Sequence, residues 1–165
     1  MSDELGTILS QFIFKQLASE LVSQGHKLTG SLIKSFELET EKQAEKVSYS
    51  FLMLNYGLSL EYGIKPNKIP YSVLPRNRGG TSKYIEGLIR FARIKFRADK
   101  RRAKQIAFAI ARKHKKEGYP LTKKIGFISN VLEADKEQIQ QIISDHYQAT
   151  IELLIKEFLT FKQKK

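Results

Sequence analysis

The sequence predicts a small α+β domain, because stretches with helical periodicity surround a stretch in which apolar and polar residues alternate. Apolar residues recur every three or four positions over Leu5–Val22 and Ile139–Phe161, as in helices that bury one face. Between residues 33 and 54 the period falls to two, which is typical of strands. We therefore expect one domain over residues 1–165, with an N-terminal helix, a small antiparallel sheet, basic helices and a long C-terminal helix.

The first helix has a defined start, a defined stop and a wide apolar face. Ser2 is the expected N-cap, Asp3 and Glu4 suit the positive end of the helix dipole, and Gly25 is the expected stop. Phe14 widens the apolar face beyond one stripe. A wide face suits either a well-buried core helix or a helix that also contacts a partner, so Phe14 is a candidate oligomer contact.

Two strands with period two are expected to pair as a hairpin. The first alternates from Lys34 to Glu41 and the second from Val47 to Leu54. The polar stretch from Thr40 to Glu45 suits the turn between them. Each strand keeps one more apolar face, as expected for a small sheet packed against a helix.

A basic stretch at about residues 64–82 reads as a loop. It holds three of the four prolines of the chain and the pair Gly79-Gly80. Proline favours extended backbone, and a loop of this length is uncommon unless it has a function. We therefore expect a mobile or extended basic loop that reaches outward.

Two basic helices are expected after this loop. Thr81 or Ser82 suits the N-cap of the first, and Asp99 suits the N-cap of the second. Alanines at helical spacing give the second helix a narrow face, which lets two helices approach closely. Gly118 and Pro120 are the expected stop of this helix.

The net charge of +12 is concentrated in one segment. Residues 64–124 hold 19 Lys and Arg against Glu86, Asp99 and Glu117, whereas the remainder has a slight excess of acids. A solvated charged face usually intersperses both signs, so the imbalance favours a negatively charged partner. The candidate contacts with DNA or an acidic protein surface are Lys65, Lys68, Arg76, Arg78, Arg97, Lys100, Arg101, Arg102, Lys104, Arg112, Lys113, Lys115 and Lys116.

The aromatic residues of this basic segment bear on the kind of contact. Helical phase predicts that Phe96 and Phe108 are buried, so the segment lacks exposed rings that stack on bases. Contact with phosphates is therefore favoured over the reading of bases. Docking onto an acidic protein is the competing explanation.

No catalytic or metal-binding pattern stands out in the chain. There is no cysteine, and His26, His114 and His146 form no zinc-binding motif. Serine-nucleophile and phosphate-loop motifs are also absent. Because no run of about 18 apolar residues occurs, no membrane span is expected. We expect no enzyme, no metal and no cofactor.

Three segments occur in a characteristic order. Thr29–Ser35 reads Thr-Gly-x-Leu-x-x-Ser, Tyr56–Gly63 ends in Glu-aromatic-Gly, and Ile106–Pro120 begins Ile-Ala-x-x-Ile-Ala-Arg-Lys and ends Gly-x-Pro. In this order they resemble the head–tail connector and tail-completion (neck) proteins of tailed bacteriophages. The resemblance covers about residues 26–120, and its motif residues are Thr29, Gly30, Leu32, Ser35, Tyr56, Glu61, Gly63, Ile106, Ala107, Gly118 and Pro120.

Two departures mark the chain as a divergent member of that family. His26-Lys27-Leu28 stands where the family often has Pro-x-Asp, and Gly57 replaces the usual alanine after the corner tyrosine. In the family pattern the first motif is a turn that enters a strand, and the second closes a strand. Gly30 and Gly63 are expected to supply turns, and Glu61 to satisfy backbone donors at its corner.

The resemblance implies a non-enzymatic virion structural protein. Such a subunit forms a homo-oligomeric ring in the neck or upper tail, around the path of the genome, and is assembled in the host cytoplasm. Its partners are the neighbouring portal, neck or tail proteins, with non-specific contact to genomic DNA and no membrane. Apolar helix faces broader than one packed layer fit this reading, and they add Ile155 and Leu159 to the candidate oligomer contacts. The alternative is a free basic protein that binds nucleic-acid phosphates without base specificity.

Overall fold

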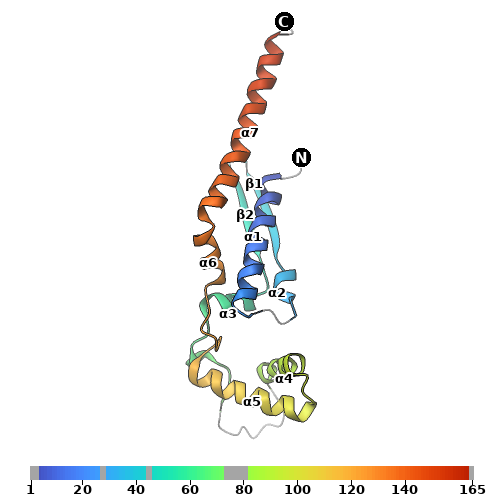
Figure 1. The fold of residues 1–165 in the computed structure, drawn as a ribbon, viewed down its shortest axis with the longest axis vertical. Helices are drawn as coiled ribbons and strands as arrows, with labels where there is room; N and C mark the ends of the chain where they lie inside the picture. The colour runs from blue at the N-terminus through green and yellow to red at the C-terminus, as the bar shows by residue number, and fades with distance from the viewer. Residues whose placement is uncertain (1–3, 27–28, 44–45, 73–81, 164–165) are drawn as a thin grey trace.

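The chain folds as an elongated α+β molecule (Figure 1). A computed structural model describes residues 4–26, 29–43, 46–72 and 82–163, with side chains as far as Leu154. In chain order the elements are α1 (Glu4–Ser23), α2 (Ser31–Lys34), β1 (Glu37–Gln43), β2 (Lys46–Leu52), α3 (Tyr56–Tyr62), the 3-10 turn η1 (Pro66–Lys68), α4 (Lys83–Phe96), α5 (Lys100–Glu117), α6 (Phe127–Ala134) and α7 (Lys136–Gln163). The predicted order of N-terminal helix, hairpin, basic helices and long C-terminal helix is confirmed.

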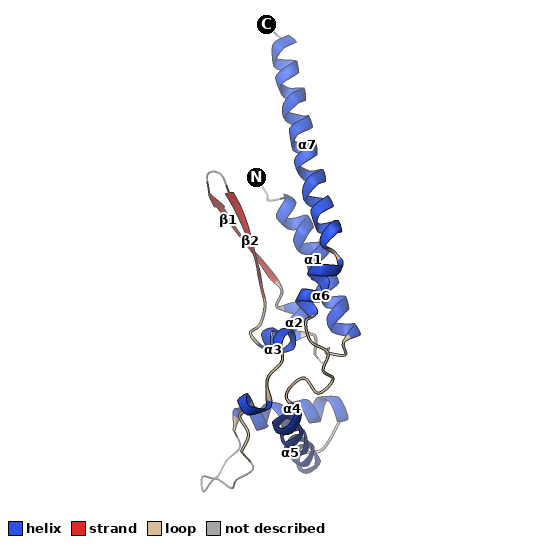
Figure 2. Ribbon diagram, turned by 90° about the vertical axis from the view of Figure 1, so that its left-hand side faces the viewer, coloured by secondary structure: helices blue, strands red, loops and turns tan. Residues whose placement is uncertain are grey.

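Helix α1 forms the centre of one end of the molecule. Its buried residues recur at steps of four, from Leu5 to Leu21, and this stripe packs against α6 and α7. Leu60 of α3 and Phe127 of α6 complete the core and are almost fully buried. Figure 2 shows α1 between the β-hairpin and the lower part of α7.

The β-hairpin is a two-stranded antiparallel sheet that packs against α1. Glu37 pairs with Leu52 at one end and Gln43 with Lys46 at the other. A lone hairpin is marginally stable in water, so it needs an apolar support. Phe14 of α1 gives this support, because its ring stacks on Phe36 at 5.4 Å and meets Phe51 edge-on at 5.7 Å.

Two of the expected strand boundaries are wrong, and three short helices (α2, α3 and α6) were not predicted. The first strand was expected from Lys34, but Ser31–Lys34 is the short helix α2 and the strand begins at Glu37. Tyr56–Tyr62 was expected to close a strand and is helix α3, whose buried residues follow helical rather than alternating spacing. Helix α6 lies in a stretch for which the sequence analysis predicted no element.

The segment after α3 is held in place where the structure describes it. Ile64 forms a β-bridge with Tyr119, and Ile69, beyond η1, is 3% exposed. Tyr71 lies against Phe108 of α5 with ring centroids 6.4 Å apart. Residues 64–72 are therefore anchored beside α5. Of the expected site and cap residues, Ser2, Asp3, Arg76, Arg78 and Thr81 lie outside the described residues.

Helices α4 and α5 form the opposite end of the molecule and cross steeply, since Figure 1 shows α4 nearly along its axis and α5 from the side. The predicted caps are confirmed: Ser82 accepts from the backbone of Ile85 at 3.3 Å, and Asp99 from that of Arg102 at 2.9 Å. The alanines at the crossing, Ala92, Ala103, Ala107 and Ala111, have no exposed surface. Close approach of the two backbones gives this basic pair its small core.

None of the helices in the described part of the chain combines the length and apolar character that a bilayer crossing requires.

Candidate functional site

The first motif residues hold the turn between α1 and the hairpin. Gly30 has φ +74, and the hydroxyl of Thr29 lies 2.7 Å from that of Ser31. The Ser35 hydroxyl donates to Leu32 O at 2.7 Å and accepts from Leu54 N at 3.1 Å, so it ties the end of α2 to the end of the hairpin. These contacts are structural, as expected for a turn.

Glu61 of the second motif anchors helix α6. Its side chain is 5% exposed, and its carboxylate accepts hydrogen bonds from Ile128 N at 2.7 Å, from Ser129 N at 3.2 Å and from the Ser129 hydroxyl. The expectation that Glu61 satisfies backbone donors is confirmed, although the donors belong to α6 and not to its own corner. A carboxylate suits this place because the first N–H groups of a helix have no intrahelical partner.

The second and third motifs meet at the junction between the two ends of the molecule. Gly63 (φ +68) and Gly118 (φ +87) flank the bridge of Ile64 with Tyr119. A Cβ on Gly118 would lie 2.7 Å from Ile64 O, so only glycine fits. Pro120 is buried just beyond the bridge.

The remaining motif residues also have structural positions. Ala107 is fully buried at the helix crossing, Ile106 is half-buried beside it, and Leu32 is 5% exposed in the main core. Tyr56 begins α3 and is 45% exposed. None of these residues is arranged for chemistry.

An aromatic cluster lies behind this junction. His114 is 5% exposed, its Nδ1 lies 2.7 Å from the Tyr84 hydroxyl, and its ring meets Tyr119 edge-on at 5.1 Å. Burial lowers the pKa of His114 and raises the pKa of Tyr84 to about 12. The cluster borders a cavity of about 710 Å³ between α4 and α3, whose walls are mainly apolar.

A metal centre or a catalytic carboxylate group is not formed by these residues. Within the described parts of the chain, no three His, Asp or Glu side chains come close enough to hold a metal ion. Glu37, Glu39 and Glu41 are spread along β1 and exposed.

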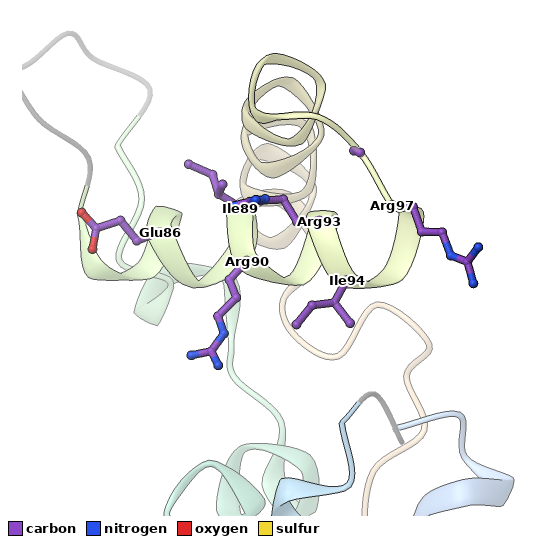
Figure 3. A pocket seen from close by; sticks show the side chains of 7 residues that line it. Glu86, Ile89, Arg90, Arg93, Ile94 and Arg97 are labelled. Atoms are coloured by element: carbon purple, nitrogen blue, oxygen red, sulfur yellow. The ribbon is translucent and has the colours of Figure 1, made fainter.

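One basic surface is an arginine row on α4, shown in Figure 3. Arg90, Arg93 and Arg97 lie beside a cavity of about 680 Å³ together with Ile94 and Glu86. Figure 3 shows Arg90 and Ile94 projecting from the same side of the helix, toward the rest of the molecule. Arg90 and Arg93 were not among the predicted contacts, although their spacing with Arg97 could have revealed the row.

The second basic surface is the outer face of α5. We use this name for Arg101, Arg102, Arg112, Lys113 and Lys116, all exposed. Helical phase places them on the side of α5 that is turned away from its buried alanines, and therefore away from α4. The two basic surfaces thus face in different directions.

The structure separates the other predicted bases by their environment. Lys65, Lys68, Lys100 and Lys104 are exposed, whereas Lys115 is half-buried and donates to Ile69 O at 3.3 Å. Lys115 therefore fixes the anchored segment to α5.

The predicted burial of Phe96 is wrong. Its side chain is 55% exposed at the last position of α4, which ends with Arg97 in a left-handed conformation. Phe108 is half-buried against Tyr71.

Apolar residues are exposed on α7 where it runs past the start of α1. Tyr147, Ile151 and Leu154 lie at helical spacing and are 55%, 56% and 58% exposed. Figures 1 and 2 both show this part of α7 extending beyond α1. Of the predicted oligomer contacts, Phe14 packs on the hairpin, and the side chains of Ile155 and Leu159 lie outside the described residues.

A second side of α7 is polar, and its side chains hydrogen-bond to one another along the helix. Gln141 donates to Asp145 at 2.6 Å, and Gln148 donates to Glu152 at 3.2 Å. Because Tyr147, Ile151 and Leu154 form an exposed apolar row beside this polar side, the row is a candidate contact surface.

No family of proteins, curated protein or solved structure matches this chain in the comparisons made.

Proposed function

We propose that the chain is a structural subunit of a homo-oligomeric ring in the neck or upper tail of a tailed bacteriophage, where it contacts neighbouring virion proteins around the genome path. The observation that carries this proposal is the apolar side of α7, formed by Tyr147, Ile151 and Leu154, which no other part of the described chain covers. The order of the three sequence motifs supports the choice of family.

The arrangement of the motif residues agrees with a scaffold role. Gly30, Glu61 and Gly118 hold turns and helix ends, so the motifs preserve a frame from which other surfaces project. A ring subunit needs a surface that contacts the neighbouring subunit. In a closed ring of more than two subunits, each contact joins two different patches, one from each neighbour. The apolar side of α7 is proposed as one of these patches.

The experiment measures assembly of the purified chain and of two double variants. Ile151→Lys with Leu154→Lys places charge on the apolar side of α7. Gln141→Lys with Gln148→Lys places the same charge on its polar side, where each lysine faces Asp145 or Glu152 one turn further on. Light scattering after size-exclusion chromatography gives the mass, and negative-stain microscopy gives the shape. The expected result is a ring-sized oligomer for the wild type and the control, and a monomer for the apolar-side variant.

A wild-type chain that stays strictly monomeric at high concentration contradicts the proposal. Assembly that survives the apolar-side substitutions contradicts the role of α7. The virion assignment has its own test, which is mass spectrometry of purified phage particles whose genome encodes the chain. Absence of the chain from such particles overturns that assignment.

A further inference from the structure

We infer that the outer face of α5 binds the phosphate backbone of duplex DNA. Its five members, Arg101, Arg102, Arg112, Lys113 and Lys116, are exposed, and Glu117 is the one acid in the whole of α5. Within the described residues none of the five has a carboxylate partner. Five neighbouring cations without counter-charges repel one another, and a polyanion relieves this repulsion.

The length of the face suits a duplex. From Arg101 to Lys116 the helix advances about 22 Å, at 1.5 Å per residue. Over that length the two strands of a duplex carry about 13 negative charges. An acidic protein patch seldom matches such a density, because its own like charges destabilise it. The charge balance therefore favours DNA over an acidic protein surface.

Within the described part of the chain, no element covers the five side chains of this face. Figure 1 shows α5 at the far end of the molecule, on the side of α4 away from the hairpin and α7. The alanine contacts with α4 make the pair a compact unit, so α5 can present its charges without further folding. Gln105 and Ala109 lie among the cations and add neither an acid nor an apolar patch.

The side chains on this face favour duplex over single-stranded DNA. Single-strand binders stack aromatic rings on bases, and the outer face of α5 has no aromatic residue. The exposed ring nearest in sequence, Phe96, belongs to α4. Contacts with phosphates alone do not distinguish one base sequence from another, so binding is expected to be non-specific.

The experiment compares two triple variants that remove the same charge from different faces. Arg102→Gln, Arg112→Gln and Lys116→Gln remove three of the five charges from the outer face of α5. Arg90→Gln, Arg93→Gln and Arg97→Gln remove the three charges of the arginine row of α4. Fluorescence anisotropy with a labelled 20-base-pair duplex of arbitrary sequence gives Kd between 50 and 200 mM salt. Circular dichroism and light scattering check that folding and assembly are unchanged in both variants.

The α5 variant is expected to weaken binding at least tenfold at low salt. Its slope of log Kd against log salt is expected to fall by about 3, since each lost phosphate contact removes about 0.9. The α4 variant is expected to change this slope by less than about 1. Because assembly is read separately, loss of the ring and loss of DNA binding are distinguishable, and the inference stands even for a monomer.

Three results overturn the inference. Equal losses in both variants show that overall charge attracts the DNA and that no particular face binds it. Binding to poly-glutamate but not to the duplex shows that the face recognises acidic protein. Tighter binding to a single strand of the same length, abolished by Phe96→Ala, shows that stacking governs recognition.

Discussion

Ile64 and Tyr119 exchange two backbone hydrogen bonds, from Ile64 N to Tyr119 O at 2.7 Å and from Tyr119 N to Ile64 O at 2.9 Å. This pair joins the segment after α3 to the segment after α5, so both connections to the basic helices pass through it. The second and third sequence motifs, far apart in the chain, each end at this bridge. The bridge therefore explains why both motifs include a glycine at their end.

Gly118→Ala is expected to destabilise the protein by about 1–3 kcal/mol. The residue has φ +87, which is costly for alanine, and the new Cβ would meet Ile64 O at 2.7 Å. Gly87→Ala is the matched control, because it lies inside α4 with nothing within 4 Å of a Cβ. This control is expected to stabilise by about 0.5–1 kcal/mol. Urea unfolding measures both, and a neutral Gly118→Ala contradicts the account of the bridge.

Glu61→Ala is expected to lower the free energy of unfolding by about 1–3 kcal/mol. The change leaves the backbone N–H groups of Ile128 and Ser129 without their acceptor at the start of α6. Ser129→Ala removes only the hydroxyl donor and is expected to cost less. Denaturant titration compares the two variants. Equal losses would show that the hydroxyl, and not the backbone contacts, accounts for the role of Glu61.

His114 is expected to make stability depend on pH below about 6.5, its ordinary pKa. Burial lowers the pKa of His114 in the folded chain, so the unfolded chain binds the extra proton first as the pH falls. Stability is therefore full above about pH 6.5 and decreases from there toward the lower pKa of the folded state. In the charged imidazole both ring nitrogens carry a proton, so Nδ1, which lies 2.7 Å from the Tyr84 hydroxyl, can then only donate.

Urea unfolding between pH 7.5 and 5.5 tests this expectation by comparison with His114→Gln. The wild type is expected to lose more stability over this range than the variant, because Gln does not titrate. Identical pH profiles would show that His114 is not the source of the dependence.

Local patterns predicted the four long helices, α1, α4, α5 and α7, and the caps of α4 and α5, because these depend on neighbouring residues. Ser82 and Asp99 could be identified as caps from their positions before helical stretches, and both accept the expected bonds. The boundaries around the hairpin failed because a short apolar stretch satisfies period two and helical spacing almost equally. Tyr56–Tyr62 forms a helix since Leu60 and Glu61 are drawn into contacts with α6, which are distant in sequence.

The site was predicted less completely, and the reason is physical. Charge composition located the basic segment but could not show that α5 and α4 turn their cations in different directions. The direction in which α5 turns its cations depends on which of its faces is buried, and the alanines at the crossing with α4 set that face. Phe96 is exposed at the last position of α4, although helical phase alone predicts a buried side chain there.

Ala107→Leu is expected to destabilise the α4–α5 pair by about 1–3 kcal/mol, because Ala107 has no exposed surface and the crossing has no room for a larger side chain. Ala109→Leu makes the same chemical change on the exposed side of α5, where it is expected to alter stability by at most about 0.5 kcal/mol. Alanine and leucine are both strong helix formers, so helix propensity does not separate the two variants. Thermal and urea unfolding, followed by circular dichroism, measure the difference. If the two variants are equally stable, the helices do not cross as closely as the buried alanines require, and the direction in which α5 presents its cations loses its structural basis.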